Sequence, residues 1–376
     1  MSLPYIPFSP SQQRVANYFA RNFGSGNGEL HTGVSTDCQM FRYAFPDWNT
    51  NPHAAFNYFN TGVQQVHAVE MAIGSVGRRL DELDSVLDFA SGFGRLTRQM
   101  IHRMDPAKLW VSDIQPESMA FQGPTFGVHS IVSGLEPSEF DPGRKFDLIF
   151  VASLFSHLPR NRFDQWLRRL WELLEPGGVL AFSVLDRSTG WMRLPYEADG
   201  FSFNPEISEI DCIENHEYGS TIVTEQFVAE AIARATDGRG HFEMVPRGLW
   251  HQDVYVLSDH PIEPPNWGLM DSYFPYSVTN QHVFGTVYGT KVREIVLKVE
   301  VLCKGSVFAV GEAQTWSEDA VVFHCGDRFL GPGWGHPVAF SLRLPRPVTY
   351  EDDIVVKAYG QWGAVRTFPV NLCEVG

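Results

Sequence analysis

The stretch Ser85-Val-Leu-Asp-Phe-Ala-Ser-Gly-Phe-Gly-Arg-Leu-Thr97 decides the fold of this chain. Its first residues, Val86-Leu87-Asp88, are typical of the buried end of a β-strand. Gly92 and Gly94 then predict a turn without obstructing side chains, and the apolar spacing after them predicts a helix. A strand, a glycine turn and a helix in this order predict a place where a small ligand lies against bare backbone.

Several classes of cofactor use such a turn, including dinucleotides, nucleoside triphosphates and S-adenosylmethionine. The dinucleotide pattern has a third glycine where this chain has Thr97, and no P-loop lysine follows. Asp88 precedes the glycines, and a carboxylate there repels a phosphate but suits the ammonium group of a methionine moiety. The segment resembles motif I of the class I S-adenosylmethionine-dependent methyltransferases, with Ala90 in place of the first glycine.

This resemblance implies S-adenosylmethionine as the methyl donor and S-adenosylhomocysteine as the product. Dinucleotide-binding sheets place an acid about 20 residues after the turn to hold the ribose, and Asp113 has that place at the end of the next predicted strand. The alternative for Asp113 is an unrelated turn aspartate. The residues predicted to bind the cofactor are Asp88, Ala90, Ser91, Gly92, Phe93, Gly94, Asp113, Ile114, Gly134, Leu135, Ser153 and Leu154.

A second resemblance lies in Phe146-Asp-Leu-Ile-Phe-Val-Ala-Ser-Leu-Phe-Ser-His-Leu158, which is similar to motif IV and the following loop of small-molecule methyltransferases. Ligands of a doubly wound sheet bind at the carboxyl ends of its strands, near the switch in strand order. His157 is therefore expected close to the donated methyl group, where an imidazole can act as a general base on a hydroxyl. The alternative is a histidine that packs and hydrogen-bonds beneath the loop.

The segment 186–224 is rich in aromatic and polar residues and lacks clear periodicity. Long loops of this kind are uncommon unless they are functional. We therefore expect a lid over the methyl acceptor, with Trp191, Arg193 and Tyr218 among the acceptor contacts. An ordinary packed loop is the alternative.

Tyr218-Gly-Ser-Thr221, together with the later His251-Gln-Asp-Val-Tyr-Val256, resembles a bacterial methyltransferase group associated with sugar or surface-polysaccharide pathways. This resemblance makes His251 a second candidate base and Asp253 a further acceptor contact. Structural hydrogen bonding at the start of a strand is the alternative for either residue.

Composition limits the partners of the chain. It has 376 residues and a formal net charge of −15, which argues against a nucleic-acid backbone as the main partner. Five cysteines are scattered without a C-x-x-C spacing, so neither a disulfide framework nor a metal site is predicted, and a cytoplasmic location fits best. No signal peptide or membrane helix is expected.

The predicted fold is an α/β doubly wound, seven-stranded Rossmann-like core whose last strand is antiparallel, followed by an all-β immunoglobulin-like sandwich. We expect an N-terminal arm at 1–50, the methyltransferase domain at 51–258, a linker at 259–280 and the sandwich at 281–376. The sandwich shows no catalytic constellation. It is interpreted as a module for homo-oligomerisation or carbohydrate contact, or as a stabilising appendage.

The predicted function is methyl transfer from S-adenosylmethionine to a small-molecule acceptor, preferably a hydroxyl of a sugar or natural product. Two alternatives stay open: N-methylation of a small amine, and a non-catalytic scaffold that binds S-adenosylmethionine. In both enzymatic versions the sulfonium is already activated, so the protein mainly supplies proximity and alignment. A hydroxyl acceptor adds the removal of a proton, whereas an amine needs no strong base.

Overall fold

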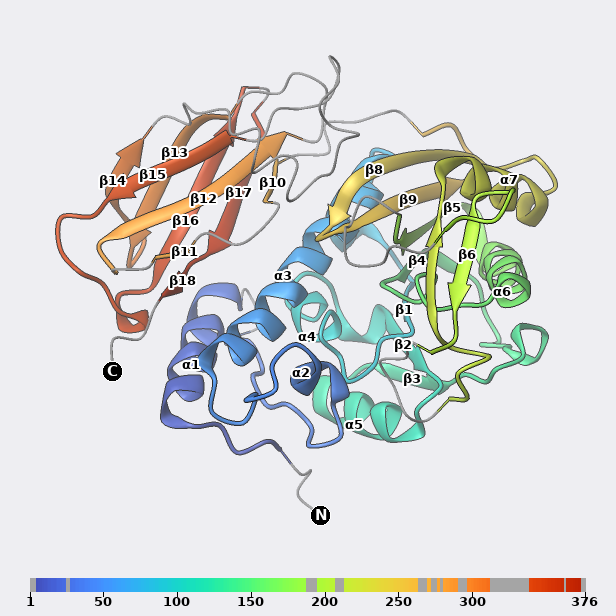
Figure 1. Cartoon of the computed structure of the whole chain (residues 1–376), viewed down its shortest axis with the longest axis horizontal. Helices are drawn as coiled ribbons and strands as arrows, with labels where there is room; N and C mark the ends of the chain where they lie inside the picture. The colour runs from blue at the N-terminus through green and yellow to red at the C-terminus, as the bar shows by residue number, and fades with distance from the viewer. Residues whose placement is uncertain are drawn as a thin grey trace. The chain divides into compact units, whose positions relative to one another are not determined.

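The computed structural model describes residues 5–24, 28–186, 195–206, 213–262, 269–271, 276–277, 280–289, 296–311, 338–361 and 363–372 (Figure 1). The chain divides into two compact units. The first takes its described residues from 1–6, 33–43 and 62–264, and the second from 7–32, 44–61 and 265–376. A search of the described helices finds none with the length and apolar character needed to cross a membrane. The domain limits given above stay a prediction.

A mixed sheet of seven strands forms the centre of the first unit, in the order β3-β2-β1-β4-β5-β9-β8. The strands are β1 (Val86–Phe89), β2 (Leu109–Asp113), β3 (His129–Val132), β4 (Phe146–Val151), β5 (Leu174–Val184), β8 (His241–Leu249) and β9 (Gln252–Ser258). The first five run parallel, and β9 pairs antiparallel with both of its neighbours. The predicted Rossmann-like sheet is confirmed, and its strand order switches between β1 and β4.

Helices lie before and between the strands of this sheet. They are α3 (Pro52–Gly74), α4 (Thr97–Met100), α5 (Pro116–Phe126), α6 (Arg160–Glu172) and α7 (Glu225–Thr236), with α2 (Gln39–Tyr43) near the N-terminus and 3-10 turns at Leu80–Glu82, Pro106–Lys108 and Pro137–Glu139. Helices α4, α5 and α6 lie between successive parallel strands, α3 precedes β1, and α7 directly precedes β8. Thr224 caps the N-terminus of helix α7, where its hydroxyl accepts the Phe227 N–H. Helix α5 was not expected from the sequence. It starts at Pro116 and ends at Gly127, which has a left-handed conformation.

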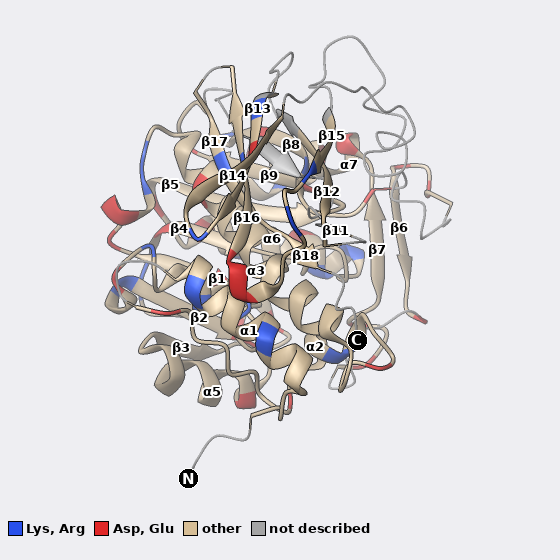
Figure 2. Ribbon diagram, turned by 90° about the vertical axis from the view of Figure 1, so that its left-hand side faces the viewer, with Lys and Arg blue, Asp and Glu red and all other residues tan. Residues whose placement is uncertain are grey.

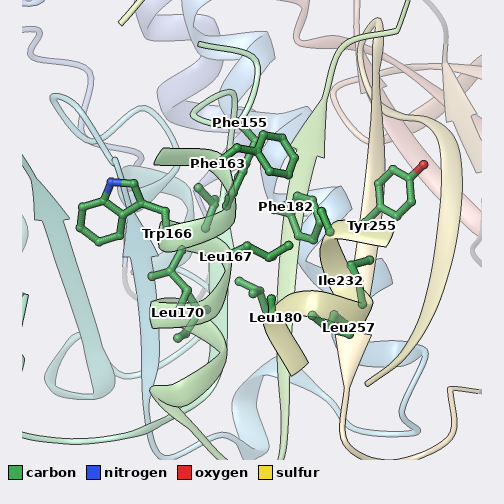
Figure 3. Close-up of a cluster of buried hydrophobic side chains, with 14 of the residues drawn as sticks. Phe155, Phe163, Trp166, Leu167, Leu170, Leu180, Phe182, Ile232, Tyr255 and Leu257 are labelled. Atoms are coloured by element: carbon green, nitrogen blue, oxygen red, sulfur yellow. The ribbon is translucent and has the colours of Figure 1, made fainter. Parts of the chain in front are cut away.

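The core beside β4 and β5 is built from aromatic and branched side chains (Figure 3). Helix α6 contributes Phe163, Trp166, Leu167 and Leu170, which recur every three or four residues and are all buried. Facing them lie Leu180 and Phe182 of β5, Tyr255 and Leu257 of β9, and Ile232 of α7. Burying an aliphatic or aromatic side chain contributes about 1.5–3 kcal/mol, so this cluster stabilises the packing of α6 and α7 against β5 and β9.

The insertion after β5 contains regular structure that the sequence pattern did not reveal. Strands β6 (Phe201–Asn204) and β7 (Ser220–Val223) form an antiparallel pair in which Phe201 is opposite Val223. The predictions at Trp191 and Arg193 lie outside the described residues.

Two sheets of mainly antiparallel strands make up most of the second unit. One has the order β10-β12-β11-β18 with β15 paired to β12, and the other has the order β14-β13-β16-β17. Their strands are β10 (Leu269–Asp271), β11 (Tyr276–Ser277), β12 (His282–Gly289), β13 (Val296–Cys303), β14 (Ser306–Gly311), β15 (Val338–Arg343), β16 (Ile354–Gly360), β17 (Val365–Pro369) and β18 (Asn371–Leu372), with a 3-10 turn at Tyr350–Asp352. The prediction of an all-β C-terminal region is confirmed at this level.

Helix α1 (Pro10–Phe23) also belongs to the second unit. It begins with a capping box between Ser9 and Gln12. Tyr18 is fully buried on this helix, where its hydroxyl donates to the Ile354 carbonyl at 2.6 Å and accepts the Val370 N–H at 3.0 Å. These bonds tie the N-terminal helix to the C-terminal strands.

Candidate active site

The turn after β1 takes a backbone conformation that few residues adopt. Ala90, Gly92 and Gly94 have φ values of 57°, 54° and 76°, in the left-handed region that glycine occupies without strain. A Cβ on Gly94 would also lie 2.8 Å from Gln122 Oε1, so no side chain fits at this position. The predicted glycine turn is present, and its backbone is open at Gly92, which is half-buried and where a Cβ would meet no atom within 4 Å.

Asp88 is the buried acid of this turn. Its side chain is 3% exposed, and it accepts a hydrogen bond of 2.9 Å from the uncharged hydroxyl of Thr97. The pKa of Asp88 is raised to about 7, mainly because the group is buried. The Thr97 hydrogen bond and the charge of Arg95 act to lower this pKa, and the charge of Asp113 acts to raise it. A cation that approaches this buried group stabilises its ionised form, the carboxylate.

Asp113 lies at the end of β2 and connects the next strand to the same turn. One carboxylate oxygen accepts the Gly92 N–H at 2.8 Å, and the other accepts the Gln115 N–H at 3.0 Å. Burial raises the pKa of Asp113, and these backbone hydrogen bonds oppose that rise. The structure therefore brings Asp88, Gly92 and Asp113 together, as the motif spacing predicted.

Two residues that support this turn were missed at the sequence level. Gln122, on α5, donates at 2.7 Å to both the Ser91 hydroxyl and the Gly92 carbonyl. Arg98, which is fully buried, donates from Nε to the Gly94 carbonyl at 3.0 Å. No sequence signal identifies either one, because α5 was not expected and an arginine in a helix is usually solvated.

The remaining predicted cofactor residues lie around the same edge of the sheet. Phe93 is buried, Ile114 is half-buried, and Gly134 and Leu135 are exposed in the loop after β3. That loop is held to β2 by a bond of 2.9 Å from the Ser133 N–H to the Asp113 carbonyl. The roles of these residues in cofactor binding stay predictions.

A closed set of hydrogen bonds joins the ends of β4, β5 and β9. The Ser153 N–H donates to Ser183 Oγ at 2.8 Å, the Ser183 hydroxyl donates to Gln252 Oε1, and Gln252 Nε2 donates to Ser153 Oγ at 2.7 Å. Ser153 has a φ of 63°, which is uncommon outside glycine. The three bonds hold the loop that begins at Ser153, next to Leu154, in this conformation.

His157 follows in the same loop and is buried, with 5% of its surface exposed. Its Nδ1 lies 2.7 Å from the Gly219 carbonyl oxygen. A carbonyl only accepts, so Nδ1 carries the proton and, in the neutral ring, Nε2 carries the lone pair. The Tyr218 ring stacks on the imidazole at a centroid distance of 4.5 Å and an interplanar angle of 9°. The structure thus brings together the predicted residues His157 and Tyr218.

His251 lies in a different environment, at the turn between β8 and β9. Its pKa is lowered to about 4, mainly by burial and also by the positive charge of Arg247. Arg247 is 1% exposed and lies between two carboxylates, 3.1 Å from Asp186 and 3.9 Å from Asp253. Asp253 also accepts the Arg247 N–H at 3.0 Å. The carboxylate of Asp253 is thus already engaged within the protein.

A cavity of about 570 Å³ opens at the other edge of the sheet. It is lined by Lys145, just before β4, by Leu174 at the start of β5 and by Asp259 just after β9. Because β9 runs antiparallel, all three mark the edge opposite to Asp88. Nowhere in the described ranges do three or more His, Cys, Asp or Glu residues form a group able to hold a metal ion. The site of interest is therefore the carboxyl edge around the turn.

Comparison with known proteins agrees with this geometry. Residues 87–180 match a family described as "Methyltransferase domain". The match spans β1 to the first half of β5, and so includes the turn, Asp113 and the loop with His157. The predicted class of enzyme, a methyltransferase, is confirmed, and S-adenosylmethionine agrees with it as the methyl donor. No curated protein matches the chain significantly.

Three solved structures that are similar to the chain are described as methyltransferases. An S-adenosylmethionine-dependent methyltransferase from Clostridium acetobutylicum is 14% identical, with a TM-score of 0.37, over 52% of this chain and 89% of its own. An O-methyltransferase family protein from Burkholderia thailandensis is 15% identical, with a TM-score of 0.39, over 60% and 63%. The 1,6-didemethyltoxoflavin-N1-methyltransferase of the same organism is 20% identical, with a TM-score of 0.38, over 55% and 82%. TM-scores this low carry no argument about the acceptor.

Proposed function

We propose that the first unit transfers the methyl group of S-adenosylmethionine to a hydroxyl of a sugar or another small natural product. The observation that carries the proposal is the buried Asp88 carboxylate, whose pKa is raised to about 7, at a glycine turn inside the matched methyltransferase domain. A buried acid with an uncharged partner suits a cationic ligand, and the ammonium group of the donor is such a ligand.

The residues of the turn fit the donor in three ways. Asp88 would bind its ammonium group, Asp113 would accept its ribose hydroxyls, and the open backbone at Gly92, where a Cβ would meet no atom within 4 Å, would let it approach closely. Asp113 is oriented for this task by the N–H groups of Gly92 and Gln115. When bound, S-adenosylmethionine supplies an electrophilic methyl group on a positively charged sulfur, so no further activation of the donor is needed.

We infer that His157 is the general base for the acceptor hydroxyl. Its Nδ1–H is directed at the Gly219 carbonyl, which leaves Nε2 as the nitrogen that can take a proton. His251 is the second candidate. Its pKa, lowered to about 4, makes it a weaker base at neutral pH than an ordinary imidazole. The proposal therefore assigns the proton transfer to His157.

The acceptor would lie between the loop at Ser153 and the insertion after β5. Tyr218 would contact it beside His157, and Asp253, Trp191 and Arg193 stay candidate contacts. A hydroxyl acceptor explains the need for a base, because an alcohol is a weak nucleophile until its proton leaves.

The test combines donor binding with turnover. Isothermal titration calorimetry should show S-adenosylmethionine binding, and a panel of glycosides and other small alcohols should yield a methylated product by mass spectrometry. His157→Gln should lower kcat by about 10² to 10⁴-fold with unchanged donor affinity, because a positioned base contributes about this factor. His251→Gln is the matched control and should keep most of the activity.

The same experiment decides between the alternatives. Activity on amines that persists after replacement of both histidines would indicate an N-methyltransferase, since a neutral amine needs no strong base. Tight donor binding with no turnover on any acceptor would indicate a scaffold. A chain that does not bind S-adenosylmethionine would contradict the proposed function as a whole.

The finer parts of the organisation also belong to this proposal. We infer an immunoglobulin-like arrangement for the C-terminal strands, with a role in carbohydrate contact or self-association. We also infer a methyltransferase of the bacterial sugar-pathway type.

Lys and Arg positions are interspersed with Asp and Glu positions along the described ribbon (Figure 2). With a net charge of −15, this distribution supports a small-molecule acceptor over a nucleic acid. The cytoplasm suits the scattered cysteines.

A further inference from the structure

The loop after β4 and the insertion after β5 are joined by a group of main-chain and side-chain bonds. The Gly219 N–H donates to the His157 carbonyl at 2.9 Å, and His157 Nδ1 donates to the Gly219 carbonyl at 2.7 Å. The Thr221 N–H donates to the Ser156 carbonyl at 2.7 Å, and the Thr221 hydroxyl donates to the Leu158 carbonyl at 2.6 Å. Residues 219–221 thus bind the loop on both sides of the His157 side chain.

The hairpin of β6 and β7 places Gly219 accurately. Gly219 follows Tyr218 directly before β7, and a Cβ at this position would lie 2.8 Å from the ring of Phe203, on β6. Only glycine lets the chain pass this close to β6. Within β7, Thr221 is fully buried and pairs with Phe203 across the hairpin. The Gly219 carbonyl, which accepts the hydrogen bond from His157 Nδ1, is therefore held in place by the packing of the insertion.

A second anchor lies on the other side of Tyr218. Arg162, on α6, has only 11% of its side chain exposed and contacts Glu217 at 2.8 Å and Glu136 at 2.6 Å. Glu217 directly precedes Tyr218, whose ring stacks on His157. The chain on both sides of Tyr218 is therefore fixed, by an ion pair before it and by the hairpin after it.

We propose that the insertion is a positioning element for His157, with Gly219 and Thr221 as the positioning residues. The Gly219 carbonyl selects the imidazole tautomer with the proton on Nδ1, and Thr221 holds the loop so that this bond forms. This inference rests on the proposed function, because it assigns a role to the base of that reaction. This role differs from that of the lid expected from the sequence, because the insertion would act on the base as well as cover the acceptor.

The test uses Thr221→Val, which keeps the shape of the side chain and removes the bond to the Leu158 carbonyl. Thr236→Val is the matched control, because Thr236 is also fully buried and donates to a carbonyl, that of Ile232, at 2.9 Å. We expect Thr221→Val to lower kcat by up to about 100-fold, as small misplacements of a catalytic group do, and to shift the pH profile. Donor affinity should be unchanged in both variants, and kcat should be unchanged in the control.

Nitrogen-15 NMR of the imidazole supplies a readout that needs no turnover. The His157 signals, assigned by their loss in His157→Gln, should show a protonated Nδ1 in the wild type and a mixture of tautomers in Thr221→Val. An unchanged tautomer and unchanged kcat in Thr221→Val would overturn the inference, as would an equal loss of kcat in Thr236→Val. If the wild type bound no donor, the proposed function would fail, whereas the NMR result would still decide whether Thr221 positions His157.

Discussion

The turn after β1 and the turn between β8 and β9 both bury an acid beside residues with positive φ, yet they differ in how the charge is balanced. Asp88, in the first turn, has the uncharged Thr97 hydroxyl as its partner, and its pKa is raised to about 7. Asp253, in the second, shares the buried cation of Arg247 with Asp186. The first turn therefore suits a cationic ligand, whereas the second balances its charges within the protein.

The largest effect is expected from removing the internal cation of the second turn. Arg247→Met would leave the carboxylates of Asp186 and Asp253 buried without it, and breaking a buried ion pair in this way costs about 3–5 kcal/mol. Urea unfolding followed by circular dichroism measures the change. Arg343→Met, which removes an exposed arginine of β15, is the control and should alter stability by less than about 0.5 kcal/mol. Equal stability of the two variants would show that the β8–β9 turn is not held by its charges.

The next effect separates ligand binding from structure. Asp88→Asn should weaken the binding of S-adenosylmethionine about 10 to 100-fold, because a hydrogen bond to a charged group contributes about 1.5–3 kcal/mol. Asp253→Asn should destabilise the protein. It should change donor affinity by less than about twofold, because Asp253 pairs with Arg247 in a different turn from that of the proposed donor site. Calorimetric titration of both variants measures this difference. A larger loss of affinity in Asp253→Asn than in Asp88→Asn would reverse the comparison.

The smallest and most specific effect is pH dependence. The raised pKa of Asp88 means that its contribution to the stability of the free protein is present below pH 4 and is lost as pH rises through about 7. The lowered pKa of His251 has the opposite sign, because its contribution is present above about pH 6.5 and is lost as pH falls toward about 4. Thermal unfolding of Asp88→Asn and of His251→Gln between pH 4 and 7 should therefore show changes of opposite slope.

The pH dependence of donor affinity should follow the titration of Asp88 alone. Between pH 5 and 7 it should rise by up to about tenfold per pH unit, because binding of the ammonium group requires the carboxylate to lose its proton. In Asp88→Asn this rise should be absent. A rise of the same size in that variant would assign the titration to another group, with Asp113 the first to examine, since burial raises its pKa too.

The geometry of the turn after β1, where we propose that the donor binds, was largely predictable because its signals are local. Glycines at positions of positive φ, an acid at the end of one strand and a second acid at the end of the next strand are visible within a short stretch of sequence. The support of this turn was not predictable. Gln122 and Arg98 reach it from helices, and the length and direction of a helix do not follow from the turn that it supports.

The region where we propose that the acceptor binds was predictable only in outline. His157 and Tyr218 were singled out separately, but their stacking and the bond to the Gly219 carbonyl depend on the β6–β7 hairpin. That hairpin gave no clear periodic pattern, because its strands have only four residues each and tertiary packing can override weak strand propensity in such short segments. The distinction between His157 and His251 was likewise invisible, since Arg247 and the burial of each ring set their chemistry.

The sequence by itself determined the sheet, the glycine turn and the acid that suits a methyl donor, because these features depend on the alternation and spacing of neighbouring residues. Only the tertiary structure decided which buried acid has an internal cation and which histidine has a carbonyl to fix its proton. Those properties arise from charges and hydrogen-bonding groups far apart in the chain, whose energies depend on distance and burial in the folded state.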